Sequence, residues 1–153
     1  IEGPFVLFLI GIRINRPWKI GSWLPVFSAI GPMIAELSRR PELDLLHSRT
    51  HFGFPGLVQY WRSAEQLAAF ATARDQLHLP AWQRFNQAVG TNGDVGIWHE
   101  TYNVSPGSNE NIYVNMPKYG MGIAGDLHDA VGPRARAEGR MKVAAAASDD
   151  AAA

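Results

Sequence analysis

The segment from Phe5 to Asn15 (FVLFLIGIRIN) constrains the fold of this chain more than any other. It alternates like a strand, yet the side chains on both of its faces are apolar over most of the length. Val6 and Phe8 belong to one face, Leu7 and Leu9 to the other. A strand that is apolar on both faces is covered on both. One layer of helices covers a single face, so we expect a second sheet, most simply that of a second subunit, on the other.

The remaining pattern predicts helices and three further strands. A helical apolar stripe runs from Trp23 to Leu37, and Gly31-Pro32 within it predicts two short helices or one kinked helix. Ser63 and Gln66 form a capping-box pattern that opens a helix, which must break at Leu79-Pro80 and continue to Val89. The expected strands are Leu43–Phe52, Leu57–Arg62 and Val95–Val104.

The order strand, helix, two strands, helix, strand predicts an α+β, ferredoxin-like fold. We expect one four-stranded antiparallel sheet with helices on one face. The domain should occupy residues 1–125, including a closing loop at 105–125 that is rich in Gly, Asn and aromatic residues. Residues 126–153 have the composition of a low-complexity tail, with a weak helix or disorder from Arg134 onward.

Composition excludes several classes of function. Lys+Arg and Asp+Glu both number 14, and no basic patch stands out, which argues against a nucleic-acid partner. The absence of cysteine excludes disulfides, thiolate nucleophiles and Cys-ligated metal sites, and fits a cytoplasmic protein. The apolar run Phe5–Ile12 is shorter than the about 20 residues that span a bilayer, so we expect no membrane association. Nucleotide-binding, hydrolase and zinc-protease motifs are absent.

Chemistry is expected first at His78, which lies beside the predicted helix break. Burial among aromatic rings would keep its imidazole neutral near pH 7 and able to accept a proton. In the alternative interpretation, His78 only caps the carbonyl groups of the preceding helix. An aromatic pocket with a few polar groups would complete the site, and its candidate residues are Trp61, Trp82, Phe85, Trp98, Tyr102, Arg13, Asn86 and His99.

His47, Arg49 and His51 alternate along one predicted strand and could share a face with Leu43 and Leu45. Their spacing is not that of a metal site. We interpret this face as a solvated strand surface of mixed charge.

Five pieces of the chain resemble a known family: GIRINRPW, VQYWRS, HLPAWQRFN, GDVGIWHETY and YVNMPKYGMG. It is a family of small monooxygenase-like proteins that includes a polyene-cleaving monooxygenase of fungal fumagillin biosynthesis. The family is similar to the antibiotic-biosynthesis monooxygenases and belongs with the dimeric α/β barrels. The resemblance covers roughly Phe5 to Gly125.

This resemblance implies a homodimer in which two ferredoxin-like sheets pack face to face. It also implies a monooxygenase that acts on an apolar polyketide- or polyene-like molecule with dioxygen and without a cofactor. His78 would then be the general base or proton shuttle, Asn86 and Trp82 would orient the substrate, and His99 would be the second polar group. A haem enzyme with His78 as axial ligand is one alternative, and a non-catalytic small-molecule-binding dimer is another.

Overall fold

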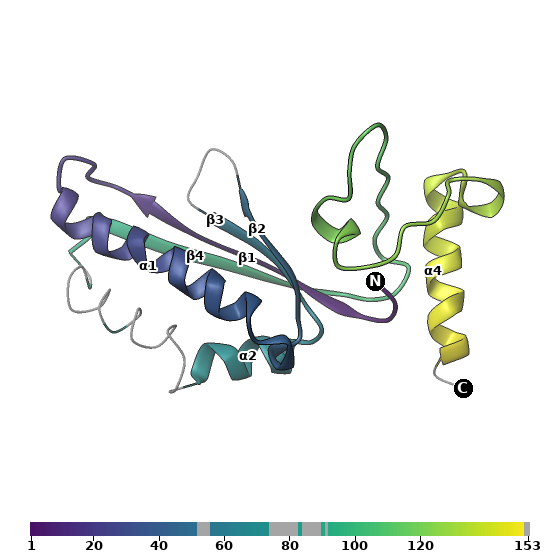
Figure 1. The fold of residues 1–153 in the computed structure, drawn as a ribbon, viewed down its shortest axis with the longest axis horizontal. Coiled ribbons are helices and arrows are strands. Elements are labelled where there is room, and N and C mark those ends of the chain that lie inside the picture. The colour runs from purple at the N-terminus through teal and green to yellow at the C-terminus, as the bar shows by residue number, and fades with distance from the viewer. Residues whose placement is uncertain (52–55, 74–82, 84–89, 91, 152–153) are drawn as a thin grey trace.

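One antiparallel sheet organises the computed structural model, which describes residues 1–51, 56–73, 83, 90 and 92–151. The strands lie in the order β2-β3-β1-β4, and each neighbouring pair is antiparallel. Two helices lie along one side of this sheet (Figure 1). The predicted ferredoxin-like α+β fold is thereby confirmed. The bounds are β1 Phe5–Ile14, α1 Ile20–Ser38, β2 Leu45–His51, β3 Gly56–Trp61, α2 Ala64–Thr72 and β4 Val95–Val104.

The main core lies between the sheet and the helices. Val6 of β1, Leu37 of α1 and Phe70 of α2 pack around Trp61, which has no exposed surface. The rings of Trp61 and Phe70 are 5.5 Å apart between centroids, a tilted aromatic contact. We call this side of the sheet the helix face. The opposite side, which carries Leu7 and Leu9 of β1, is the open face.

Helix α1 is a single continuous helix, which rules out the two separate short helices that Gly31-Pro32 allowed. Pro25 and Pro32 both lie inside it. Near its start, Trp23 and Val26 pack against Ile12 of the sheet on either side of Pro25. By length and composition alone α1 could cross a bilayer, although core helices of soluble proteins and signal sequences pass the same test.

The start of α1 is tied to the start of β4 by Asp94, whose side chain is buried. Arg16 donates a hydrogen bond of 2.8 Å to Asp94 Oδ1, and Ser22 donates one of 3.0 Å to Oδ2. Lys19 Nζ lies 3.1 Å from both carboxylate oxygens. Burial works to raise the pKa of Asp94, but these hydrogen bonds and the charge of Lys19 hold that pKa below its ordinary value.

Helix α2 begins at the predicted cap, because Ser63 Oγ accepts a hydrogen bond of 3.2 Å from the Gln66 backbone N–H. It extends to Thr72, and the chain turns to extended backbone at Ala73. The predicted continuation through Leu79-Pro80 to Val89 lies outside the described residues, apart from Gln83.

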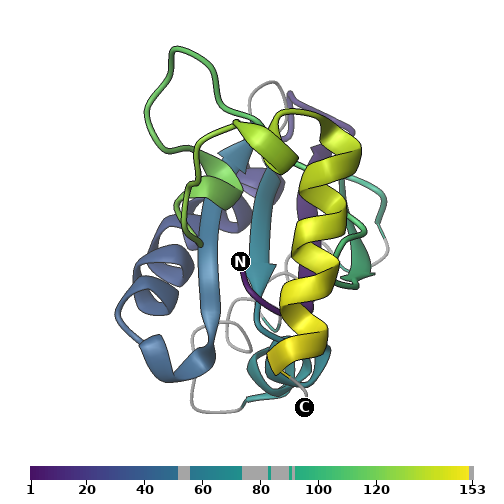
Figure 2. The ribbon, with the colours of Figure 1, turned by 90° about the vertical axis from the view of Figure 1, so that its right-hand side faces the viewer.

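The segment 105–125 packs over one end of the open face. Its 3-10 turn η2, Gly120–Gly122, buries Met121 against Phe5, Val58 and Tyr60. Beyond it the tail forms helix α4, Ala137–Ala151, which the sequence left as either a weak helix or disorder. Arg140 of α4 binds Glu110 and the Arg134 carbonyl, and α4 stands beside the segment at the end of the molecule (Figure 2).

Candidate functional site

The open face carries three rows of residues that the strand register sets side by side across the sheet. Residues directly opposite one another in antiparallel strands share a face, so each row runs from β2 through β3 and β1 to β4. The rows are His47, Tyr60, Leu7 and Tyr102; Arg49, Val58, Leu9 and Glu100; and His51, Gly56, Gly11 and Trp98.

A hollow of about 430 Å³ lies on the open face, lined by residues of the last two rows together with Leu7 and Tyr60 of the first. Leu9 and Val58 form its apolar floor, and Trp98 closes it on the β4 side. The two central positions of the third row are glycines, so the floor there has no side chains. The Trp98 ring lies so close over Gly11 that an added Cβ would be 2.9 Å from three of its atoms. This volume falls within the range of about 300–1,000 Å³ typical of small-molecule sites.

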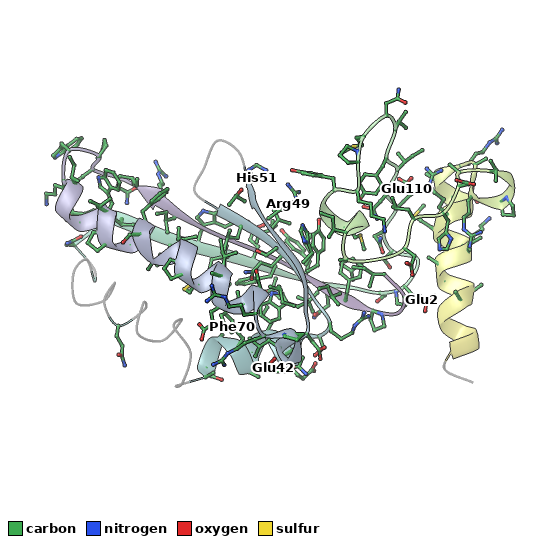
Figure 3. All side chains as sticks on the ribbon, viewed as in Figure 1. Glu2, Glu42, Arg49, His51, Phe70 and Glu110 are labelled. Atoms are coloured by element: carbon green, nitrogen blue, oxygen red, sulfur yellow. The ribbon has the colours of Figure 1, made fainter. Side chains whose placement is uncertain are left out.

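The β2 edge of the open face is cationic. Arg49 and His51 line the hollow, and His47 stacks on Tyr60 with ring centroids 6.3 Å apart. Burial and the neighbouring Arg49 charge lower the pKa of His47, so its ring is neutral at pH 7 and can accept a proton. Figure 3 shows Arg49 and His51 on the side of the sheet away from Phe70.

The prediction that Leu43 and Leu45 share one strand face with His47 was wrong, and Leu43 lies in a 3-10 turn, Pro41–Leu43, before β2 begins. A shift between Leu45 and His47 places Leu45 opposite Trp61 on the helix face, while His47 lies opposite Tyr60 on the open face. Leu45 therefore packs in the main core. An irregularity of this kind adds a residue to one strand, which alternation alone cannot reveal.

Tyr119 and Gly120 of segment 105–125 hold Arg49 in place. Arg49 Nη1 donates a hydrogen bond of 3.1 Å to the Tyr119 hydroxyl, and its guanidinium carbon lies 5.0 Å from the centre of that ring. Gly120 has a φ of +53°, and a Cβ there would be 3.4 Å from Arg49 Nε. A glycine thus allows the backbone to approach the guanidinium.

The β4 edge is acidic. The Tyr102 hydroxyl donates a hydrogen bond of 2.7 Å to Glu100 Oε2. This hydrogen bond and the charge of Glu100 raise the pKa of Tyr102. The open face therefore has a cationic edge at β2, an apolar floor and an acidic edge at β4.

The structure divides the residues predicted for the site between two faces. Arg13, Trp98 and Tyr102 lie on the open face, whereas His99 lies opposite Ile10 on the helix face with its ring 5.7 Å from that of Phe8. Trp61 is in the main core, where its Nε1 donates a hydrogen bond of 3.1 Å to Gln59 Oε1. The other candidates, His78, Trp82, Phe85 and Asn86, lie outside the described residues.

The sequence reasoning did not include Arg49 and His51 among the site residues, although it noted that they could share a face. Their alternation with His47 was the available signal. That alternation indicates a site only once the pairing with β3 is known, because β3 places Val58 opposite Arg49 and Gly56 opposite His51. Within the described ranges, no three His, Asp or Glu side chains are grouped as metal ligands would be.

Comparison with known proteins adds to this geometry. A family described as Monooxygenase af470-like matches residues 5–121. The curated protein "Monooxygenase af470" of Aspergillus fumigatus is 31% identical over 132 residues, which are 74% of this chain and 44% of that protein. The chain thus spans less than half the length of this relative. No solved structure matches significantly.

Proposed function

Because the chain belongs to the Monooxygenase af470-like family, we propose that it oxygenates an apolar polyketide- or polyene-like molecule bound in the open-face hollow, without a cofactor. The observation that carries this proposal is the hollow itself. It combines an apolar floor of Leu9 and Val58 with a polar edge formed by Arg49 and His51. Apolar lining with a few convergent polar groups is typical of small-molecule sites.

The proposed reaction uses the substrate as its own reductant. A base removes a proton from an activated carbon, and the resulting carbanion gives electrons to dioxygen. One oxygen atom enters the substrate, the other leaves as water, and the substrate loses two hydrogens in exchange. In this proposal His51, which lines the hollow, is the base, and Arg49 stabilises negative charge that develops on the substrate.

We also propose that a second copy of the chain covers the open face. Trp98 is 39% exposed and Tyr102 is 49% exposed on this face. A second sheet packed against it would bury these side chains and separate the hollow from bulk water, which strengthens electrostatic stabilisation inside a site.

Oxygen consumption tests the proposed reaction. Purified protein is given a 1,3-dicarbonyl polyketide analogue or a conjugated polyene, and uptake is followed with an oxygen electrode while the product is identified by mass spectrometry. Trp98→Ala should abolish most of the uptake, because the indole is a wall of the hollow. Trp18→Ala is the matched control, since Trp18 is 73% exposed and outside the hollow.

The alternatives give different results in the same preparation. A Soret band in the absorption spectrum that disappears in His78→Ala would support the haem enzyme and contradict the cofactor-free reaction. Saturable ligand binding without oxygen uptake on either substrate class would support the non-catalytic binding dimer.

A further inference from the structure

We propose that Arg49 and Tyr119 form an anchor for the carboxylate of an apolar acid whose hydrocarbon part lies in the hollow. This inference rests on the proposed function for the location of the ligand, and it adds the chemical class of that ligand. The anchor lies at the β2 edge, where segment 105–125 meets the sheet.

The charge of Arg49 is not balanced by the described part of the chain. No described carboxylate forms an ion pair with it, and its one described hydrogen bond goes to the neutral Tyr119 hydroxyl. Its Nε is shielded from solvent and has no partner among the described residues. A guanidinium has several N–H donors in a planar fork that matches a carboxylate. Because Nε is covered, a ligand would bind the outer N–H groups of the guanidinium, and a half-buried cation without an ion-pair partner among the described residues is suited to an anionic ligand.

The guanidinium is also held in a defined position before any ligand arrives. Tyr119 binds Nη1, and the backbone of Gly120 lies against Nε. Met121, the next residue, is buried against Tyr60 and fixes this turn on the sheet. A side chain that is already ordered loses less conformational entropy on binding, so the anchor is pre-organised.

The second row sets the orientation of the ligand. It begins with Arg49 on β2, crosses the apolar pair Val58 and Leu9, and ends with Glu100 on β4. Strands are about 4.8 Å apart, so the two outer strands are separated by about 14 Å. A carboxylate is attracted to the Arg49 end and repelled at the Glu100 end, and the apolar residues between them accept the hydrocarbon part.

The test compares an acid with its own ester. The probes are 2,4-decadienoate and methyl 2,4-decadienoate, titrated against the full chain by isothermal calorimetry. The wild type should bind the acid at least ten-fold more tightly than the ester. Arg49→Gln should lose this preference while keeping its affinity for the ester, and Arg49→Lys should keep part of it. The matched control is Arg39→Gln, because Arg39 lies at the exposed end of α1 and should leave the preference unchanged.

Each outcome decides the proposal. Equal affinity of the wild type for acid and ester would overturn it, and so would an unchanged preference in a folded Arg49→Gln. Dissociation of a dimer by Arg49→Gln with the preference retained would also overturn it, and would indicate a carboxylate from a second copy as the partner of Arg49. A preference for the acid without oxygen uptake would support the anchor and contradict the monooxygenase proposal. Oxygen uptake without a preference for the acid would support the monooxygenase proposal and contradict the anchor.

Discussion

Replacing Gly11 with alanine should deform the hollow without unfolding the protein. The new Cβ would lie 2.9 Å from Cε2, Cζ2 and Nε1 of Trp98. Carbon atoms in contact are about 3.5–4.0 Å apart, so the indole must move by at least about 0.6 Å. Trp98 is 39% exposed, so the ring can swing outward, away from the sheet.

The expected loss of stability is small because two effects oppose each other. Overpacking a site typically costs about 1–3 kcal/mol. Removing a glycine from a strand returns about 0.5–1 kcal/mol of backbone entropy. The net change of about 1 kcal/mol corresponds to a melting temperature lower by about 2–4 °C for a chain of this size. However, the displaced Trp98 indole no longer forms the wall of the hollow in its original position. Ligand affinity should therefore fall about ten-fold, or about 1.4 kcal/mol.

Calorimetric titration with 2,4-decadienoate and a thermal melt measure these two quantities. Gly96→Ala is the matched control, because Gly96 lies on the same face and its added Cβ would come no closer than 3.8 Å to any atom. The tryptophan emission of Gly11→Ala, compared with that of the same variant carrying Trp98→Phe, reports the movement of the ring. Unchanged affinity in Gly11→Ala, or an equal loss in Gly96→Ala, would refute the assignment of Trp98 as a wall of the site.

Other perturbations test separate parts of the structure. Leu7→Glu places a charge on the open face and should convert a dimer to monomers in sedimentation velocity. Phe8→Glu places a charge on the helix face and should unfold the chain. A wild type that is monomeric at micromolar concentration would contradict the dimer. Met121→Ala removes a buried side chain of the open-face cluster and should lower the free energy of unfolding by about 2–5 kcal/mol. Segment 105–125 should also be cleaved faster by a protease, and an unchanged rate of cleavage would mean that Met121 does not fix the segment. The pKa of Asp94 is lowered in the folded state, so its contribution to stability is present above its unfolded value of 3.8 and is lost as pH falls through the lower folded value. Asp94→Asn should therefore unfold more readily at neutral pH and show a weaker dependence on pH in acid denaturation than the wild type.

Local patterns were sufficient to predict most elements of the sheet, although the second strand, predicted from Leu43, begins at Leu45. Alternation in Phe5–Asn15 predicted β1 to within one residue, and Val95–Val104 matches β4 completely. The Ser63 cap predicted the start of α2, because capping depends on residues three apart in the chain. The order of these elements then restricted the fold to the ferredoxin-like arrangement.

The sequence by itself determined that β1 is apolar on both faces, and therefore that one face remains to be covered beyond the helices. Only the tertiary structure decided what lies on that open face. Arg49, Val58, Leu9 and Glu100 come from four strands spread over more than half of the chain, and they form one row solely through the register of three strand pairs. The shift beside Leu45 and the approach of Gly120 to Arg49 are likewise long-range. Local periodicity reports which residues share a face of one strand, whereas a site depends on how separate strands align, and that alignment is a property of the folded sheet.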